Sequence, residues 1–252
     1  VRERIQKACG IPEKHVMISC SHTHSGPWAA GRLDIESLEA GAQQPEEYVK
    51  SLNDKIVTAV ENAKKGAFEA EFTSGTAHCG AESGVGGNRR APGGPHDPLV
   101  SVMAVRDKEK KIRGIFVNYT LHPTFIHEWS TVCTADYPGY LKQQLRELHP
   151  DAVVGFSQGA SGNQSSRYYR QGESFDEAER VGRILGKAAA TVLEHAAWSN
   201  ELPIRTADKS IELELRTFGT EEELEKKVAQ DKKTYEELYE KYGQSENREE
   251  YY

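Results

Sequence analysis

The sequence of 252 residues has no long hydrophobic run. No segment approaches the roughly eighteen consecutive apolar residues of a membrane-spanning helix, and no basic segment followed by an apolar one marks a signal peptide. The chain does not begin with methionine, and VRERIQKACG reads as an amphipathic helix that lacks a starting cap and ends at Gly10. We therefore expect no membrane span and a further segment before residue 1, which leaves the cellular compartment open.

Positive charge is also scarce. Lys and Arg number 32 against 39 Asp and Glu, which gives a net charge of -7, and the local basic pair of note is Arg89-Arg90. Binding of nucleic acid needs clustered Lys and Arg side chains that neutralise phosphates. We therefore expect no nucleic-acid partner.

Closely spaced cysteine pairs are missing as well. The four cysteines, Cys9, Cys20, Cys79 and Cys133, lie far apart and form no CxxC motif. This spacing favours neither a zinc ribbon nor a dense disulfide framework. We interpret their side chains as small buried hydrophobic groups.

What the sequence contains is a repeated order of strand, polar loop and helix. Short runs that are apolar or alternate in polarity predict strands at residues 15–20, 67–75, 99–107, 112–121 and 152–156. The third and fourth runs are joined by a polar turn, which predicts a hairpin.

Amphipathic helices are expected at residues 45–66 and 136–149, and from residue 174 onward. Asp136 is the expected N-cap of the second helix, and Ser174 with Glu177 forms a capping box for the third. The sequence thus predicts an α/β fold with a mixed β-sheet core and flanking helices. Ligand-binding loops of such folds lie at the carboxyl ends of the strands.

The character of the chain changes after about residue 203. IELEL, at 211–215, alternates as a strand, and Thr220 with Glu223 makes a capping box for a highly charged helix with a thin apolar stripe. Such a helix is usually solvated over most of its surface. The sequence ends in NREEYY without a closing element, so we expect the protein to continue beyond Tyr252.

Histidines follow two of the predicted strands. SCSHTHSGPWAAG brings His22 and His24 after the run at 15–20, and His122 comes directly after the run at 112–121. Residues i and i+2 of an extended backbone project to the same side, so His22 and His24 can face one centre. A catalytic zinc takes about three protein ligands and leaves one position open. We expect a metal site here, with His127 and Glu128 as further candidates that are more simply explained as loop residues.

Five segments together carry a family resemblance. MISCSHTHSGP, GGNRRAP, VNYTLHPT, TADYPGYL and FSQGASGNQSS occur in the order and rough spacing seen in the catalytic domain of neutral, non-lysosomal ceramidases and their bacterial homologues. The resemblance covers roughly residues 1–195, and its most specific part is HTHSGP. Members of this family are zinc-dependent amidases that cleave the N-acyl bond of ceramide.

The resemblance implies roles for individual residues. His22 and His122 resemble zinc ligands, and His24 resembles the histidine beside the metal that acts as acid or base. Arg89 corresponds to the arginine that faces the scissile group, and Ser165 to the serine of the glycine-asparagine-x-serine loop. The family completes its zinc site with a glutamate and a tyrosine from farther along than residue 252, so the remaining Zn2+ ligands are expected there.

These roles make a coherent hydrolytic mechanism. Zinc lowers the pKa of water and polarises a carbonyl, so activated water would attack the amide carbonyl. His24 would transfer the proton to the leaving amine, and Arg89 with main-chain N–H groups of residues 159–165 would stabilise the oxyanion. Whether Ser165 attacks or only positions the substrate stays open.

The resemblance implies a ceramidase-like catalytic domain over residues 1–217, with residues 218–252 as the charged start of a C-terminal portion. The expected substrate is a small or lipid-like acyl amide. Ser166 and Arg167 replace the proline and asparagine that follow the family's serine. These changes support the amide class better than ceramide itself. The alternatives are a catalytically degenerate binding domain of this family and a TIM-barrel metal hydrolase.

Overall fold

The computed structural model describes residues 1–27, 46–127, 130–202, 205–207, 209–214 and 219–242. The chain divides into two compact units, Val1–Ala207 and Asp208–Tyr252. The sequence places its boundary after residue 217, and the assignment of a catalytic domain to 1–217 stays a prediction.

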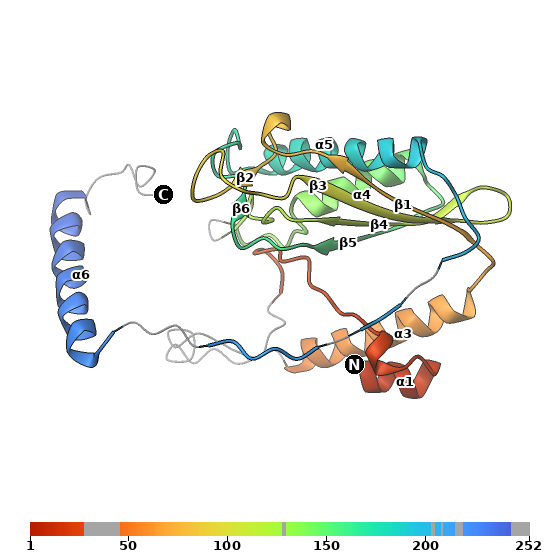
Figure 1. Cartoon of the computed structure of the whole chain (residues 1–252), viewed down its shortest axis with the longest axis horizontal. Helices are drawn as coiled ribbons and strands as arrows, with labels where there is room; N and C mark the ends of the chain where they lie inside the picture. Colours follow the sequence, from red (N-terminus) through yellow and green to blue (C-terminus); the bar gives the residue numbers. More distant parts are fainter. Residues whose placement is uncertain (28–45, 128–129, 203–204, 208, 215–218, 243–252) are drawn as a thin grey trace. The chain divides into compact units, whose positions relative to one another are not determined.

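The first unit is built on a mixed β-sheet (Figure 1). Its strands in the described residues are β1 (Glu71–His78), β3 (Leu99–Arg106), β4 (Ile112–Tyr119) and β5 (Val153–Gln158), in the order β1-β3-β4-β5. β3 pairs antiparallel with β1 and with β4, whereas β4 and β5 are parallel. The expected hairpin and the expected α/β fold with a mixed sheet are confirmed, and this mixed sheet rules out a TIM barrel for the described residues.

Two helices pack against this sheet and against each other (Figure 1). α4 (Tyr137–Leu148) lies between β4 and β5 in the chain, and α5 (Phe175–Glu194) contacts β1 and β3. The side chain of Asp136 accepts a hydrogen bond from the N–H of Tyr137, and that of Ser174 accepts one from Glu177. Both predicted helix starts are therefore confirmed.

Alternation along the strands directs every second side chain into the core between sheet and helices. The buried side chains of β3 and β4 are Val100, Val102, Ala104, Ile115, Val117 and Tyr119. α5 approaches α4 closely at Gly182, where a Cβ atom would lie 2.6 Å from the carbonyl oxygen of Tyr137. This close approach holds the first turn of α4 against α5.

The first unit also contains a second, very short sheet. It pairs β2 (Gly87–Asn88) with β6 (Gln164–Ser165) in antiparallel register, and the short 3-10 helix η2 (Ala81–Ser83) precedes it. Gly86 lies deep in this region: a Cβ atom there would fall 2.1 Å from Leu121 Cδ1 and 3.1 Å from Ser165 O. The absence of a side chain at this position therefore lets β2 approach the end of β4.

Near the start of the chain, α1 (Arg2–Cys9) and α3 (Glu46–Lys65) pack together as predicted helices. Their shared cluster contains Ile5, Cys9 and Val57 and is separate from the main core. Gly10 ends α1 with a φ of 69°, the left-handed conformation expected of a glycine cap.

The strand predicted at 15–20 is wrong. The 3-10 helix η1 (Glu13–His15) is followed by residues without regular structure, and Met17 and Ile18 are 77% and 45% exposed. Val16 packs against the cluster of α1 and α3 and not against a sheet. An apolar run becomes a strand only when a neighbouring strand pairs with it, and the described residues offer this segment none.

In the second unit, α6 (Glu221–Tyr242) begins with the predicted capping box, since Thr220 and Glu223 exchange hydrogen bonds. The strand predicted at 211–215 is wrong in its described part, where Ile211 and Leu213 are exposed without a ladder, and residue 215 lies outside the described residues. None of the helices in the described part of the chain is long and apolar enough to cross a membrane.

The cysteines only partly follow the prediction. All four are described and free; Cys9 and Cys79 are buried, whereas Cys20 and Cys133 are exposed. The interpretation as buried hydrophobic groups is therefore confirmed for the first two and wrong for the others, which lie on loops.

Candidate metal centre

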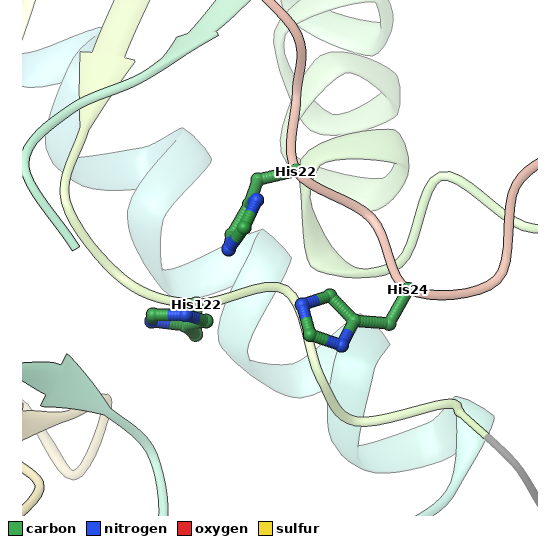
Figure 2. Close-up of side chains that lie close together, drawn as sticks. All are labelled: His22, His24 and His122. Carbon is green, nitrogen blue, oxygen red and sulfur yellow. The ribbon is translucent and has the colours of Figure 1, made fainter. Parts of the chain in front are cut away.

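Three histidines from two distant segments meet in the first unit. Figure 2 shows the rings of His22, His24 and His122 gathered together, with the first two on one segment and His122 on the segment after β4. Each residue offers one ligating atom, and these atoms all lie within 4.8 Å of one another. The ring centroids of His22 and His122 are 4.7 Å apart. The structure thus brings together the two expected ligands and places His24 beside them.

His122 is oriented by a hydrogen bond that the sequence did not predict. Its Nδ1 lies 2.9 Å from the carbonyl oxygen of Gln164, so Nδ1–H donates and Nε2 keeps its lone pair for a metal. Burial lowers the pKa of His122, although the hydrogen bond to Gln164 acts in the opposite direction. The neutral imidazole is the form that binds metal ions, so this environment favours ligation.

His22 has an unusual backbone conformation. Its φ is 65°, in the left-handed region that residues other than glycine seldom adopt. The segment is therefore not the regular extended backbone expected from the sequence, although His22 and His24 both lie near His122. Such conformations persist where surrounding contacts enforce them, and they are common at functional sites.

The small polar residues around His22 and His24 attach this segment to the rest of the unit. Thr23 Oγ1 donates to the carbonyl oxygen of Thr134 over 2.8 Å, and the N–H of Thr134 donates to Ser25 O over 2.9 Å. Ser25 Oγ also donates to the carbonyl oxygen of Ile126 over 2.6 Å. These contacts join HTHS to the segment that follows His122, which gives the hydroxyl residues of the motif a physical role.

The predicted residues Arg89 and Ser165 lie on the short β2–β6 sheet or directly beside it. The N–H of Arg89 donates to Asn163 O over 2.8 Å, and Ser165 pairs with Gly87. The positive charge of Arg89 is close enough to lower the pKa of His122. The hydroxyl of Ser165 is buried and accepts a hydrogen bond from the N–H of Arg167.

The side chain of Asn88 shapes the loop that follows it, which carries Arg89 and Arg90. Its side-chain oxygen accepts from the N–H groups of Arg90 and Ala91 at 2.9 and 3.0 Å, and its amide nitrogen donates to Pro95 O. This is the local turn that asparagine side chains stabilise. The NR dipeptide of the motif thus combines a turn-forming residue with the charged one.

Of the two further candidates, His127 is not part of the cluster formed by His22, His24 and His122. His127 Nε2 lies 3.3 Å from Glu173 Oε2, so this histidine pairs with the segment before α5. Glu128 lies outside the described residues.

Two solved structures with a similar fold are ceramidases. A ceramidase complexed with C2 has a TM-score of 0.62 and 20% sequence identity, over 77% of this chain and 34% of that chain. A neutral ceramidase from Pseudomonas aeruginosa has a TM-score of 0.64 with the same identity and coverage. This chain shares the fold of part of the neutral ceramidase. It spans about a third of the length of these ceramidases, and no protein-family model and no curated protein matches it.

The residues of this ceramidase-like fold suit a metal ion of the zinc type. In a tetrahedral zinc site, nitrogen ligands lie about 2.0–2.1 Å from the metal and hence about 3.3 Å from one another. The ligating atoms of the three histidines lie within 4.8 Å of one another, so the widest pair would need to approach by about 1.5 Å to reach this spacing. Imidazole groups are typical ligands of zinc and of copper, iron and nickel, so the donor set fits a transition metal.

Proposed function

We propose that this protein is a ceramidase-like hydrolase that uses zinc to cleave N-acyl amide bonds. The observation that carries the proposal is the meeting of His22, His24 and His122 within a neutral ceramidase fold. The chain spans about a third of the length of these ceramidase structures, so its activity and its substrate are proposals.

His22 and His122 are the metal ligands in this proposal. The chemistry that a zinc ion supplies when bound is polarisation of the amide carbonyl and a lower pKa of water. The hydrogen bond from His122 Nδ1 to Gln164 O supports Nε2 as the ligating atom.

His24 is the acid or base of the proposal. Its ligating atom lies within 4.8 Å of those of His22 and His122, so its ring lies beside the proposed metal position and could reach an amide bound there. An imidazole titrates near neutral pH and can hand a proton to the leaving amine.

Arg89 is the group that stabilises negative charge on the carbonyl oxygen. Two main-chain N–H groups of the 159–165 loop already donate hydrogen bonds within the protein: that of Gly159 to Tyr119 O and that of Gln164 to Ser161 O. These two cannot serve an oxyanion without breaking main-chain hydrogen bonds. The guanidinium of Arg89, whose charge acts on His122, therefore takes the larger part.

Ser165 positions the substrate in this proposal. Its hydroxyl accepts the N–H of Arg167, which anchors the hydroxyl oxygen within the loop. Position 167 is one of the departures from the family pattern, and it borders Ser165. We therefore propose an N-acyl amide with a lipid-like chain as the substrate class and do not restrict it to ceramide.

The test measures the zinc content of the protein and its rate of hydrolysis of two substrates, an N-acylated sphingoid base and a fluorogenic N-acyl amide. We expect His22→Ala and His122→Ala to lose zinc and activity. His195→Ala is the matched control, because His195 is exposed near the end of α5 and its Nδ1 interacts with Thr191 O. Full activity in both His22→Ala and His122→Ala would refute the proposal.

His24→Ala separates two roles in the same assay. A variant that keeps zinc and loses turnover supports the acid or base role. A variant that loses zinc as well makes His24 a third ligand, which the distances also allow.

A binding domain without catalysis is the second candidate. The changed residues Ser166 and Arg167 next to Ser165 motivate it, since Ser166 is fully buried and its hydroxyl has no hydrogen-bond partner among the described residues. Stoichiometric zinc without turnover of any amide in a panel would favour this candidate over the hydrolase.

A further inference from the structure

Asp136 does more than begin a helix. It is 1% exposed and has φ 56° and ψ -155°, a backbone conformation that residues other than glycine rarely adopt. An N-cap requires neither deep burial nor this strain, because exposed Ser, Thr and Asn serve equally well. A strained backbone conformation of this kind persists only where surrounding contacts hold it, so Asp136 is expected to make contacts beyond the cap.

The first set of contacts holds the segment that follows His122. Asp136 Oδ2 accepts hydrogen bonds from the N–H groups of Phe125 and Ile126, each over 2.9 Å. The adjacent Tyr137 donates its hydroxyl to the carbonyl oxygen of Leu121 over 2.8 Å. The segment that carries His122 is therefore fixed on both sides by two consecutive residues.

The second set of contacts reaches the segment of the other two histidines. The N–H of Asp136 donates to Thr134 Oγ1 over 3.0 Å. The main chain of Thr134 in turn binds Thr23 and Ser25, which flank His24. Ser25 Oγ donates a hydrogen bond to the carbonyl oxygen of Ile126, and the N–H of Ile126 donates to Asp136. The contacts thus form a closed circuit through both histidine segments.

We infer that Asp136 is the positioning residue of the histidine site: it fixes the segment of His22 and His24 relative to that of His122. Phe125 and Ile126 are fully buried, so their N–H groups have no access to water if the carboxylate is changed. The segment would then shift to satisfy them, and the histidine spacing would shift with it. This inference rests on the proposed metal site for its function, but the spacing itself can be measured without metal.

Two variants test the positioning role of Asp136, one that changes its carboxylate and one that removes a single hydrogen bond to its N–H group. Asp136→Asn keeps the size of the side chain but replaces one carboxylate oxygen by an NH2 group that cannot accept a hydrogen bond. Thr134→Val keeps the shape of the side chain and removes only the acceptor for the N–H of Asp136, so it remains informative if the first variant fails to fold. Ser174→Ala is the matched control, because it removes the N-cap of α5, which is separate from the circuit.

The measurement is the affinity of full-length protein for Co2+ and Zn2+, with the visible spectrum of the Co2+ form and the Tm of each variant. We expect Asp136→Asn and Thr134→Val to bind both metals about 10–100-fold more weakly and to change the Co2+ bands. Ser174→Ala should lower Tm without changing either. Unchanged affinity and spectrum in both site variants, or equal changes in Ser174→Ala, would overturn the inference.

A metal-free readout separates this inference from the proposed function. In the apo protein, NMR contacts between the rings of His22 and His122 should be present in wild type and weakened in Thr134→Val. If wild type binds no metal, the proposed function fails while this comparison still decides the role of Asp136. Equal ring contacts in all variants would refute the positioning role.

Discussion

Gly86→Ala tests the packing behind His122. Gly86 faces Leu121, the residue before His122, and a Cβ atom would lie 2.1 Å from Leu121 Cδ1 and 3.1 Å from Ser165 O. Leu121 is 1% exposed and cannot turn toward solvent, so either the leucine or β2 must move. Both movements disturb the site, because Leu121 directly precedes His122 in the chain and β2 directly precedes Arg89.

The magnitude follows from overpacking a filled core, which costs about 1–3 kcal/mol. For a unit of this size, each kcal/mol lowers Tm by about 2–4 °C. We expect Gly86→Ala to lower Tm accordingly and to reduce zinc affinity. Gly172→Ala is the matched control, since a Cβ atom there meets nothing within 4 Å and its φ is not positive.

The assay combines thermal unfolding with zinc titration of both variants. Gly172→Ala should stay within about 0.5 kcal/mol of wild type or gain slightly, as an unstrained replacement of glycine does. The reasoning is refuted if Gly86→Ala matches Gly172→Ala in Tm and zinc affinity, because the close approach to Leu121 would then not constrain the site.

Three further predictions concern the chemistry. Burial lowers the pKa of His122 below its usual 6.5, so the unfolded chain binds more protons than the native one between the two pKa values. The free energy of unfolding of the metal-free protein should therefore fall as pH falls from about 6.5 through the native pKa. Denaturant unfolding at several pH values measures this pH dependence, which His122→Gln should remove. Arg89→Ala should lower kcat by about 10²–10³-fold, whereas Arg90→Ala, an adjacent and exposed control, should leave it nearly unchanged; equal effects in steady-state assays would contradict the role of Arg89. Ser165→Ala should raise KM more than it lowers kcat and should keep its zinc, and complete loss of kcat with zinc bound would instead identify a nucleophile.

Local patterns in the sequence predicted most of the regular elements. The helix at 136–149 was expected from its N-cap Asp136 and its apolar spacing, and α4 begins at the next residue. The hairpin of β3 and β4 was expected from two apolar runs around a polar turn. Such features depend on neighbouring residues, and periodicity and capping report them directly.

What the sequence did not predict depends on partners far along the chain. The run at 15–20 has the pattern of a strand but pairs with none of the described strands, and Ile18 remains exposed. Asp136 was recognised as a cap, whereas its hydrogen bonds to Phe125 and Ile126 require the tertiary fold. Nothing in a single sequence reports that Thr23 and Thr134 are in contact.

The meeting of the histidines lies between these two cases. The positions of His22 and His122 after apolar runs predicted that they would come together, and the structure places them so although the first run is not a strand. The orientation of His122 by Gln164 O was not predictable, because that carbonyl carries no side-chain signal.

The most direct test of the central claim is anomalous scattering at the zinc absorption edge from crystals of the full-length protein. One peak is predicted at about 2.0–2.1 Å from His122 Nε2 and from a ring nitrogen of His22. This prediction is contradicted if zinc-loaded, active protein shows its peak away from these two histidines.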